Sequence, residues 1–316
     1  MIGLGAVYLF AGLVFAAVAA ASALDRTNKP RWLNAGFWGL LAASFLFGDV
    51  LGDFGNGVLV LSLVAVAGFG LGIGALATTG TEERRESARR FGNKLFFIAL
   101  TIPAITLAGS LAFKYVFVGG APLVDPAQVT LVSLALATIV AAFIARAVLK
   151  QPFPAMLQEG RRLLDLVSWA ALLPQMLAAL GAVFALAGVG GIVGGLAVQV
   201  IPGESPLAAV IAYTVGMALF TAIMGNAFAA FPVMTAGIGL PLIVTKFGGD
   251  PAIMAAIGML SGFCGTLTTP MAANFNLVPV ALLNLTDRYA VIKAQFPTAL
   301  MVLFANTVLM YAIVYR

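Results

Sequence analysis

Long apolar stretches, separated by short polar segments, run along the whole chain. They approach or exceed the ~20 residues that a helix needs to cross a ~30 Å hydrocarbon core, and none shows the strict alternation of a barrel strand. We expect ordinary spans over about 2–24, 32–48, 57–80, 95–112, 127–149, 163–187 and 294–315. The first stretch has no basic start, so we interpret it as a retained helix and not as a signal peptide.

Two further apolar runs are too long to be single spans. Residues 206–245 would form a helix of about 60 Å, which is twice the hydrocarbon thickness. Their only candidate turn lies around Met224, Gly225 and Asn226, and it carries no charge, whereas a turn in cytoplasmic water usually does. We therefore expect a re-entrant hairpin whose tip stays inside the protein.

Residues 251–283 would form a helix of about 50 Å, and a break near the middle would explain this length. Pro270 removes a backbone donor and disfavours the helical conformation at Thr269, while Gly265 and Pro279 loosen the flanks. Such a break frees backbone groups and presents the partial charges of two helix ends, which can bind a cation and an anion. The N–H groups near residues 271–274 suit a carboxylate.

Hydroxyl and amide side chains gather at the turn and the break. An interpretation without function is available, because threonine often bonds to a carbonyl of its own helix, and Pro and Gly are common in membrane helices. The occurrence of both interruptions in neighbouring runs favours a binding site. Its candidate residues are Gly225, Asn226, Ala227, Thr266, Thr268, Thr269, Pro270, Asn274 and Asn276, with a sodium ion expected at Asn226, Thr268 and Thr269.

Composition and charge agree with a membrane protein. The 316 residues are 62% hydrophobic and 9% charged, far from the proportions of soluble domains. The loops 25–31, 81–94, 146–165 and 284–293 hold 14 of the 17 Lys and Arg residues, which places these loops in the cytoplasm and the N-terminus outside. The positive net charge of +5 is thereby explained without nucleic acid, and we expect the inner membrane of a bacterium.

The residue types exclude much enzymology. One cysteine, Cys264, and no histidine rule out an internal disulfide, a typical zinc site, a haem-binding histidine and a Ser-His-Asp triad. Asp49 and Asp53 suggest an intramembrane aspartyl protease only weakly, because we interpret them as a solvated outer turn and Asp165 as a charge at a helix start. We expect no enzyme and no cofactor. The scarcity of deep carboxylates favours sodium over protons as a coupling ion.

A Gly-rich segment precedes the hairpin. It has neither the strand nor the lysine of a phosphate-binding loop, so we interpret its glycines as close-packing or hinge positions. These glycines are Gly188, Gly190, Gly191, Gly194 and Gly195.

The turn GNA and the break TLTTPMAAN resemble those of the ion transporter superfamily, in which each repeat contains a re-entrant hairpin and a helix broken in mid-membrane. The usual Ser-Asn-Thr tip is replaced here by Gly225, Asn226 and Ala227, which keeps the asparagine and loses both hydroxyls. The strings MGNAFAAFPVMTAGIG and GFCGTLTTPMAANFNLVP are also similar to a bacterial membrane family that forms the larger subunit of two-component 5-oxoproline transporters. This resemblance implies a second, smaller membrane subunit that carries the other hairpin.

The resemblance divides the chain into a four-span bundle over 1–125, for scaffolding or partner contact, and a transport repeat over 126–316. An inverted-repeat transporter needs two hairpins and two broken helices around its site. The span 95–112 contains Pro103 in LTIPAITLAGS and is the only candidate for a missing element, although a Pro-kinked ordinary helix fits better. The half-site therefore requires a partner subunit or a homodimer.

These patterns predict an all-α polytopic membrane protein with about nine or ten membrane segments. The predicted function is that of a secondary active transporter subunit, which takes up a small organic anion, 5-oxoproline or a similar carboxylate, with sodium ions or protons. A scaffold subunit that transports nothing is the alternative, and a channel is a third possibility.

Overall fold

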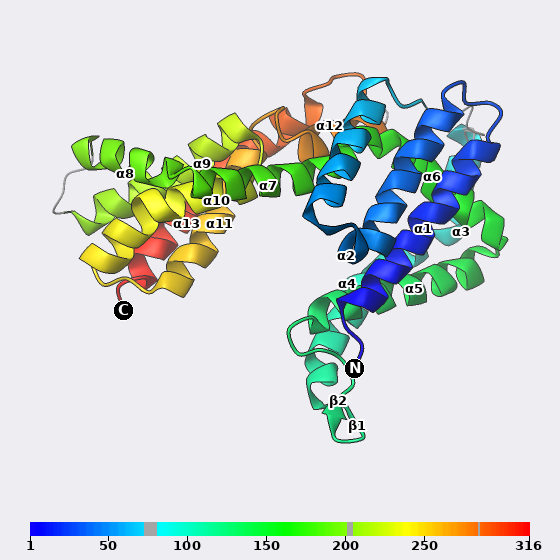
Figure 1. Ribbon diagram of the computed structural model, residues 1–316, viewed down its shortest axis with the longest axis horizontal. Coiled ribbons are helices and arrows are strands. Elements are labelled where there is room, and N and C mark those ends of the chain that lie inside the picture. The colour runs from blue at the N-terminus through cyan, green and yellow to red at the C-terminus, as the bar shows by residue number, and fades with distance from the viewer. Residues whose placement is uncertain (73–80, 201–204, 284) are drawn as a thin grey trace. The chain divides into compact units, whose positions relative to one another are not determined.

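The structure is a computed structural model, and it describes residues 1–72, 81–200, 205–283 and 285–316 (Figure 1). The described part contains eight helices that are long and apolar enough to cross a membrane. The protein is therefore a helical, multi-pass membrane protein, as predicted. Its chain forms two compact units, Met1–Ser168 and Trp169–Arg316. The functional division expected at residues 125 and 126 stays a prediction, and the compact units divide later because α5 and α6 pack against α4 and α1.

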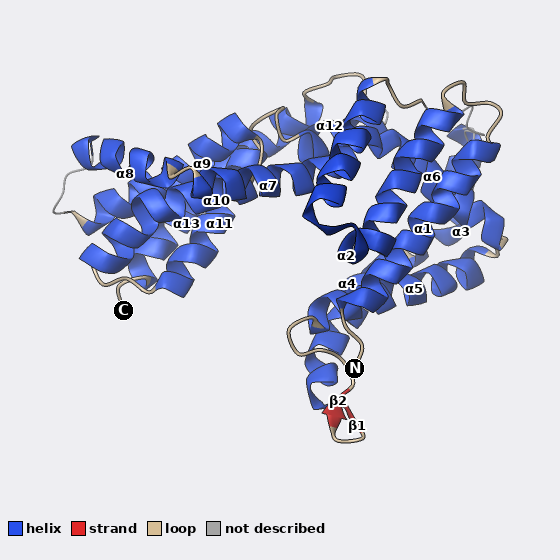
Figure 2. Ribbon diagram, viewed as in Figure 1, coloured by secondary structure: helices blue, strands red, loops and turns tan. Residues whose placement is uncertain are grey.

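The first unit consists of helices with one small β-hairpin (Figure 2). The hairpin pairs β1 (Phe117–Val118) with β2 (Ala121–Pro122) after a short 3-10 turn, η1 (Phe113–Tyr115). The helices are α1 (Leu4–Leu24), α2 (Arg31–Gly68), α3 (Thr81–Phe91), α4 (Lys94–Ala112), α5 (Val129–Leu149) and α6 (Phe153–Val167). Helix α1 packs along α2, and α4 packs along α5, which gives two helix pairs.

The second unit is also helical, and its core surrounds α9. Its elements are η2 (Ser168–Leu172) at the boundary, α7 (Leu173–Leu186), α8 (Val189–Val200), α9 (Pro206–Met224), α10 (Ala227–Met234), η3 (Thr235–Lys246), α11 (Pro251–Thr266), α12 (Ala273–Leu282) and α13 (Ala290–Ile313). Helix α9 packs against α11, α13 and the α10–η3 limb, with Tyr213 and Met217 fully buried at its centre.

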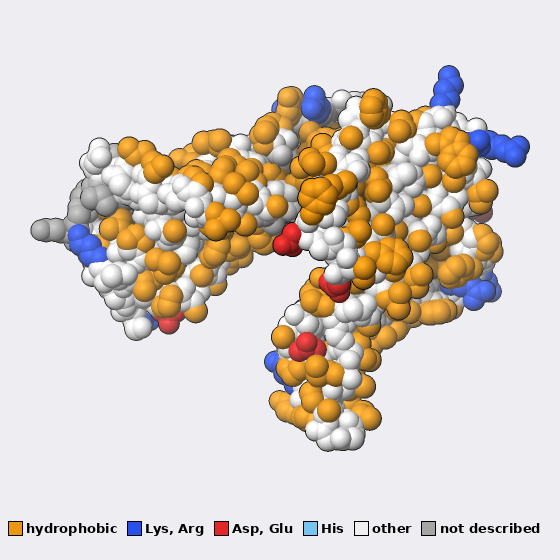
Figure 3. All heavy atoms as spheres, viewed as in Figure 1, with side chains coloured by type: hydrophobic (Ala, Val, Ile, Leu, Met, Phe, Trp, Pro, Cys, Tyr) orange, Lys and Arg blue, Asp and Glu red, His pale blue; other side chains and the backbone are white. Residues whose placement is uncertain are grey.

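Apolar side chains cover most of the surface of both units that faces the viewer in Figure 3. Phe304 on α13 is 72% exposed and Leu61 on α2 is 70% exposed. Exposed apolar surface of this extent indicates contact with a membrane, because monomeric soluble proteins rarely expose large contiguous apolar patches.

The predicted spans agree with the structure at 2–24, 95–112, 127–149 and 294–315. Helix α4 is continuous with Pro103 inside it, so the span 95–112 is an ordinary helix and neither a hairpin nor a broken helix. The first turns of α7 and α9 contain proline. Backbone N–H groups in a first turn have no acceptor within the helix, so the lack of an N–H on proline costs no hydrogen bond there.

Two predicted boundaries are wrong. The loop expected at 49–56 is replaced by helix on both sides of one residue, Gly52, whose φ of 61° interrupts α2. Glycine reaches this conformation without steric penalty, so a single residue can change the direction of the chain where we expected a loop. The span expected at 57–80 ends at Gly68, since residues 69–72 are not helical, and residues 73–80 lie outside the described residues. The span expected at 163–187 falls largely within the helical run Phe153–Leu186, in which α6 ends at Val167 and η2 precedes α7.

Candidate functional site

Helix α9 ends in a turn of two residues, Gly225 and Asn226. Gly225 has a φ of 78°, in the left-handed region that favours glycine, and its N–H donates to the carbonyl of Thr221 over 2.7 Å. Asn226 caps the returning limb, since its Oδ1 accepts a hydrogen bond of 2.7 Å from the N–H of Phe228. Only 4% of Asn226 is exposed. The turn therefore lies at the predicted residues and is buried in protein.

The returning limb of the hairpin joins α10 to a π-helix, η3, and α8 packs tightly against it. A Cβ atom added to Gly194 would lie 2.6 Å from the carbonyl oxygen of Gly237, so no larger residue fits at this crossing. Gly188, just before α8, has a φ of 69°. The close-packing interpretation is thus confirmed at Gly190 and Gly194 but not at Gly191 and Gly195, whose Cβ positions have nothing within 4 Å, and the hinge interpretation stays a prediction.

The broken helix is interrupted over residues 267–272, between α11 and α12. The hydroxyls of Thr266 and Thr268 each donate to the backbone carbonyl three residues earlier, over 2.6 and 2.8 Å. The hydroxyl of Thr269 accepts from the N–H of Met271 over 3.2 Å. The first two hydroxyl protons are therefore used locally, while the hydroxyl oxygens keep lone pairs for a further contact.

Asn276 holds the two sides of the break together. Its Nδ2 donates to the carbonyls of Thr266 and Thr269, both over 2.7 Å, and the residue is fully buried. These carbonyls lose helical partners at the interruption, so the amide replaces them. The Oδ1 of Asn276 and the Oγ1 of Thr221 are buried without a hydrogen-bond partner, and both are oxygens of the kind that bind hard cations.

The turn and the break lie against each other. A Cβ atom added to Gly225 would lie 2.7 Å from the carbonyl oxygen of Met271, so only glycine allows this approach. Below this contact, α11 crosses α9 with its backbone nearly touching, and a Cβ atom on Gly265 would lie 2.1 Å from the carbonyl oxygen of Ala218. Ala227 faces the same helix, 3.0 Å from the Cβ position of Gly262. Small residues thus bring the two interrupted segments together.

The second half of the broken helix begins without a side-chain cap. Its N-cap residue is Ala272, which offers no side-chain oxygen to the first N–H groups of α12, although its carbonyl accepts from the N–H groups of Phe275 and Asn276. Asn274, in the first turn, is half-buried, and Pro270 is exposed. These N–H groups lie at the positive end of a helix, where a carboxylate is stabilised.

The predicted sodium ligands each make hydrogen bonds close to their own position in the chain. Within the ranges that the structure describes, no hydrogen bond joins Asn226 to Thr268 or Thr269. The structure brings together Gly225 with the break, Ala227 with α11, and Asn276 with Thr266 and Thr269. The roles of these residues as ligands stay predictions.

A second buried polar cluster, in the first unit, escaped the sequence analysis. Asp165 is 3% exposed, and its Oδ1 accepts hydrogen bonds from Nδ2 of Asn34 over 2.9 Å and from Nε1 of Trp38 over 3.0 Å. The guanidinium of Arg161 lies 3.7 Å from Asp165 and 2.5 Å from Asp25. We call these five residues the charged cluster.

The interpretation of Asp165 as a charge at a helix start is wrong. The residue lies near the end of α6 and is buried against α2, because its negative charge is offset by Arg161 and two neutral donors. The only sequence signal for this cluster is a spacing of four residues, which places two side chains on the same face of a helix. It occurs between Asn34 and Trp38 and between Arg161 and Asp165. Neither spacing identifies its partner across more than 100 residues.

Asp25 closes the charged cluster at the loop between α1 and α2. Partial burial raises the pKa of its carboxyl, but hydrogen bonds from Thr27 and Arg161 outweigh burial and leave the pKa below the usual value of 3.8. Asp25 is therefore ionised at neutral pH and stays paired with Arg161.

Comparison with known proteins gives one family. The family model described as "Protein of unknown function (DUF979)" matches residues 5–315. No curated protein and no solved structure matches the chain.

Proposed function

The chain belongs to the DUF979 family, and we propose that it is a subunit of a secondary active transporter for a small organic anion. 5-Oxoproline, or a similar carboxylate, is the proposed substrate, and an ion gradient is the proposed driving force. The chain resembles the ion transporter superfamily in the order of its elements, and we assign it there as part of this proposal. The location is the bacterial inner membrane with the N-terminus outside.

One observation supports this function above the others, namely the contact of Gly225 at the hairpin turn with Met271 in the break. Two interruptions of apolar helices are rarely tolerated away from water unless they are buried in protein or line a cavity. Here they pack against each other with uncharged polar groups on both, and Asn226, Thr266, Thr269 and Asn276 are buried while Pro270 and Met271 are exposed. An arrangement of this kind is how secondary transporters hold a substrate at mid-membrane.

The two ligands have different places at this site. The substrate carboxylate would bind at the uncapped start of α12, near Asn274, where backbone N–H groups point outward from the helix end. A sodium ion would be held by oxygens of Asn226, Thr268 and Thr269, with the unpaired Oδ1 of Asn276 as a further ligand. Both ligands would then be bound without any titrating side chain.

The preference for sodium over protons depends on the described residues of the second unit, among which no carboxylate is buried. Asp165 is buried, but it belongs to the first unit and its oxygens are already bonded. Sodium is therefore the coupling ion that we propose, and a proton-coupled mechanism is the alternative. The site is half of an inverted pair, so a smaller subunit with the other hairpin, or a second copy of this chain, would complete it.

A scaffold role without transport is the second candidate, and one observation favours it. The hydroxyls of Thr266 and Thr268 donate to their own helix, as threonines without a binding role do. In that case the break would serve only contacts between helices.

Uptake of labelled 5-oxoproline into proteoliposomes tests the proposal, with the chain reconstituted together with any subunit that co-purifies. We expect saturable uptake that requires an inward sodium gradient and that is lost in Asn226→Ala and Thr269→Val at normal protein levels. The matched controls are Asn56→Ala and Thr101→Val, whose side chains bond to backbone carbonyls outside the site. Unchanged uptake in both site variants would leave the scaffold role, and uptake that does not saturate would indicate a channel.

A further inference from the structure

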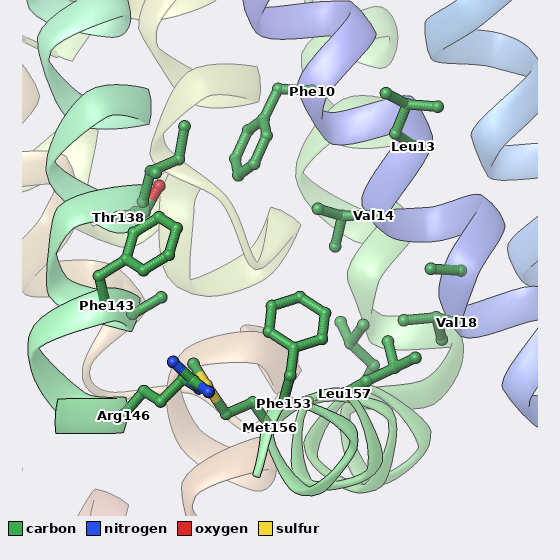
Figure 4. A pocket seen from close by; sticks show the side chains of 15 residues that line it. Phe10, Leu13, Val14, Val18, Thr138, Phe143, Arg146, Phe153, Met156 and Leu157 are labelled. Carbon is green, nitrogen blue, oxygen red and sulfur yellow. The ribbon is translucent and has the colours of Figure 1, made fainter. Parts of the chain in front are cut away.

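The first unit contains an apolar cavity of about 490 Å³ between α1, α5 and α6, far along the chain from the proposed transport site. Figure 4 shows Phe10, Val14 and Val18 of α1 facing Thr138 and Phe143 of α5 across this space. Thr138 donates its hydroxyl proton to the carbonyl of Ala135, so water has few partners on these walls. The cavity lies within the size range of small-molecule sites.

The cavity is one lipid leaflet deep. Its lining runs from Phe10 to Val18 on α1 and from Thr138 to Arg146 on α5, which is about 12 Å at 1.5 Å per residue. Half of a ~30 Å hydrocarbon core is ~15 Å, so the length corresponds to one layer of acyl chains. Arg146 lies at the end where α5 finishes, which is the membrane surface if α5 is a span.

Helix α6 closes that end as an amphipathic helix. Its apolar side chains recur every three or four residues on the face toward the cavity, at Phe153, Met156, Leu157, Gly160 and Leu164. The opposite side carries Glu159 and Arg162, which pair with each other. Such a helix lies in the plane of the membrane surface.

Arg146 is the cation at the mouth of the cavity, beside Phe153 and Met156 (Figure 4). The neighbouring Arg161 and Arg162 are neutralised by Asp25 and Glu159. Arg146 forms no ion pair with any residue that the structure describes. A guanidinium with free donors next to an apolar channel matches an anionic phosphate joined to a hydrocarbon chain.

We propose that this cavity binds one anionic phospholipid, with an acyl chain between α1 and α5 and the phosphate on Arg146. Basic pockets between membrane helices at the cytoplasmic side bind such headgroups. A helix of a partner subunit is the competing occupant, but an apolar helix would leave the guanidinium of Arg146 at the mouth without an anion, whereas a phospholipid supplies one. The inference is independent of the transport proposal.

Native mass spectrometry of the full chain in mild detergent tests the inference. The protein would be mixed with equal amounts of phosphatidylglycerol and phosphatidylcholine that carry identical acyl chains. We expect one phosphatidylglycerol to be retained preferentially, and Arg146→Gln to lower this preference about fivefold, as expected for one basic residue near a charged headgroup. Ala142→Phe, which fills the cavity, should lower retention of both lipids.

Two matched variants serve as controls. Arg288→Gln removes an exposed cation in the other unit, and Ala147→Phe enlarges an exposed residue on α5 that does not line the cavity. Both should retain phosphatidylglycerol as the unaltered chain does. If Ala142→Phe fails to fold by circular dichroism, Gly160→Leu fills the same space from α6.

Three results would overturn the inference. They are equal retention of the two lipids by the unaltered chain, the same lipid preference in Arg146→Gln and Arg288→Gln, and release of a co-purifying protein subunit by the filling variant in place of lipid. The last result would assign the cavity to a partner helix.

Discussion

The two units bury polar groups in opposite ways. In the charged cluster of the first unit, three ionisable side chains lie together, and every carboxyl oxygen has a donor or a cation near it. In the second unit, the turn and the break bury only neutral amides, hydroxyls and backbone groups. A buried charge must be compensated where it lies, whereas a neutral acceptor can be left unpaired at moderate cost.

The number of unpaired atoms does not separate the two regions. Among the residues that the structure describes, each unit has two buried side-chain oxygens without a partner, on Ser22 and Asn28 in the first and on Thr221 and Asn276 in the second. Their surroundings differ, because only those of the second unit flank an interrupted helix that packs against a turn. The comparison teaches that position beside freed backbone groups, and not lack of a partner alone, distinguishes a candidate ligand site.

Removal of Asp165 should have the largest effect on stability. Asp165→Ala leaves Nε1 of Trp38 and one of the two N–H groups on Nδ2 of Asn34 unpaired, and it removes one of the two carboxyl groups near Arg161. We expect a loss of about 3–5 kcal/mol. Thermal unfolding in detergent measures it. Asp287→Ala, which removes an exposed pair with Lys293 and one exposed hydrogen bond from the N–H of Tyr289, should lower the unfolding temperature far less. Equal unfolding temperatures for the two variants would mean that the charged cluster is not a structural element.

Removal of the Asn276 amide should have the next largest effect. Asn276→Ala leaves the carbonyls of Thr266 and Thr269 unpaired inside the protein, which costs about 1–3 kcal/mol. Asn56→Ala is the matched control, because Asn56 donates to Gly48 over 2.8 Å across the bend in α2 but is only half-buried. Thermal unfolding of both variants is compared. If Asn276→Ala and Asn56→Ala lower the unfolding temperature equally, burial of Asn276 does not increase the contribution of its hydrogen bonds to stability.

The contact between turn and break should give the smallest effect. Gly225→Ala and Gly248→Ala both place alanine at a positive φ, of 78° and 70°, with similar backbone strain of about 1–2 kcal/mol. Only the first also pushes a Cβ atom against Met271, since nothing surrounds Gly248. We expect Gly225→Ala to lose about 1 kcal/mol more in thermal unfolding. An equal loss of stability in Gly225→Ala and Gly248→Ala would show that the turn moves away from Met271 at no measurable cost.

Local signals in the sequence predicted much of the fold. Apolar length located α1, α4, α5 and α13, and the uncharged Gly225 with its neighbour Asn226 located the turn of the hairpin. Pro270 located the break. Proline and glycine restrict or widen the backbone conformations at their own position, so their effect can be predicted from the local sequence. These features depend on residues within a few positions of each other.

The charged cluster could not be predicted in this way. Asp165 lies 131 residues from Asn34 and 127 from Trp38, and a single sequence does not show which polar residues meet across such distances. The bridging role of Asn276 was missed in part, since its position in the polar cluster was predicted but its bonds to both sides of the break were not. The bend at Gly52 was mistaken for a loop because two aspartates flank it.

The crossing of α9 and α11 has a consequence for how the protein assembles. Where Gly265 meets Ala218, the helices touch through backbone atoms, and the large side chains packed beside this point, such as Met217, exchange lipid and not water for protein contacts once the helices are in the membrane. Expulsion of water therefore contributes little here, and dispersion between closely fitting surfaces must hold the crossing. Such an attraction acts equally well after both helices have entered the lipid, so insertion can come first and docking second.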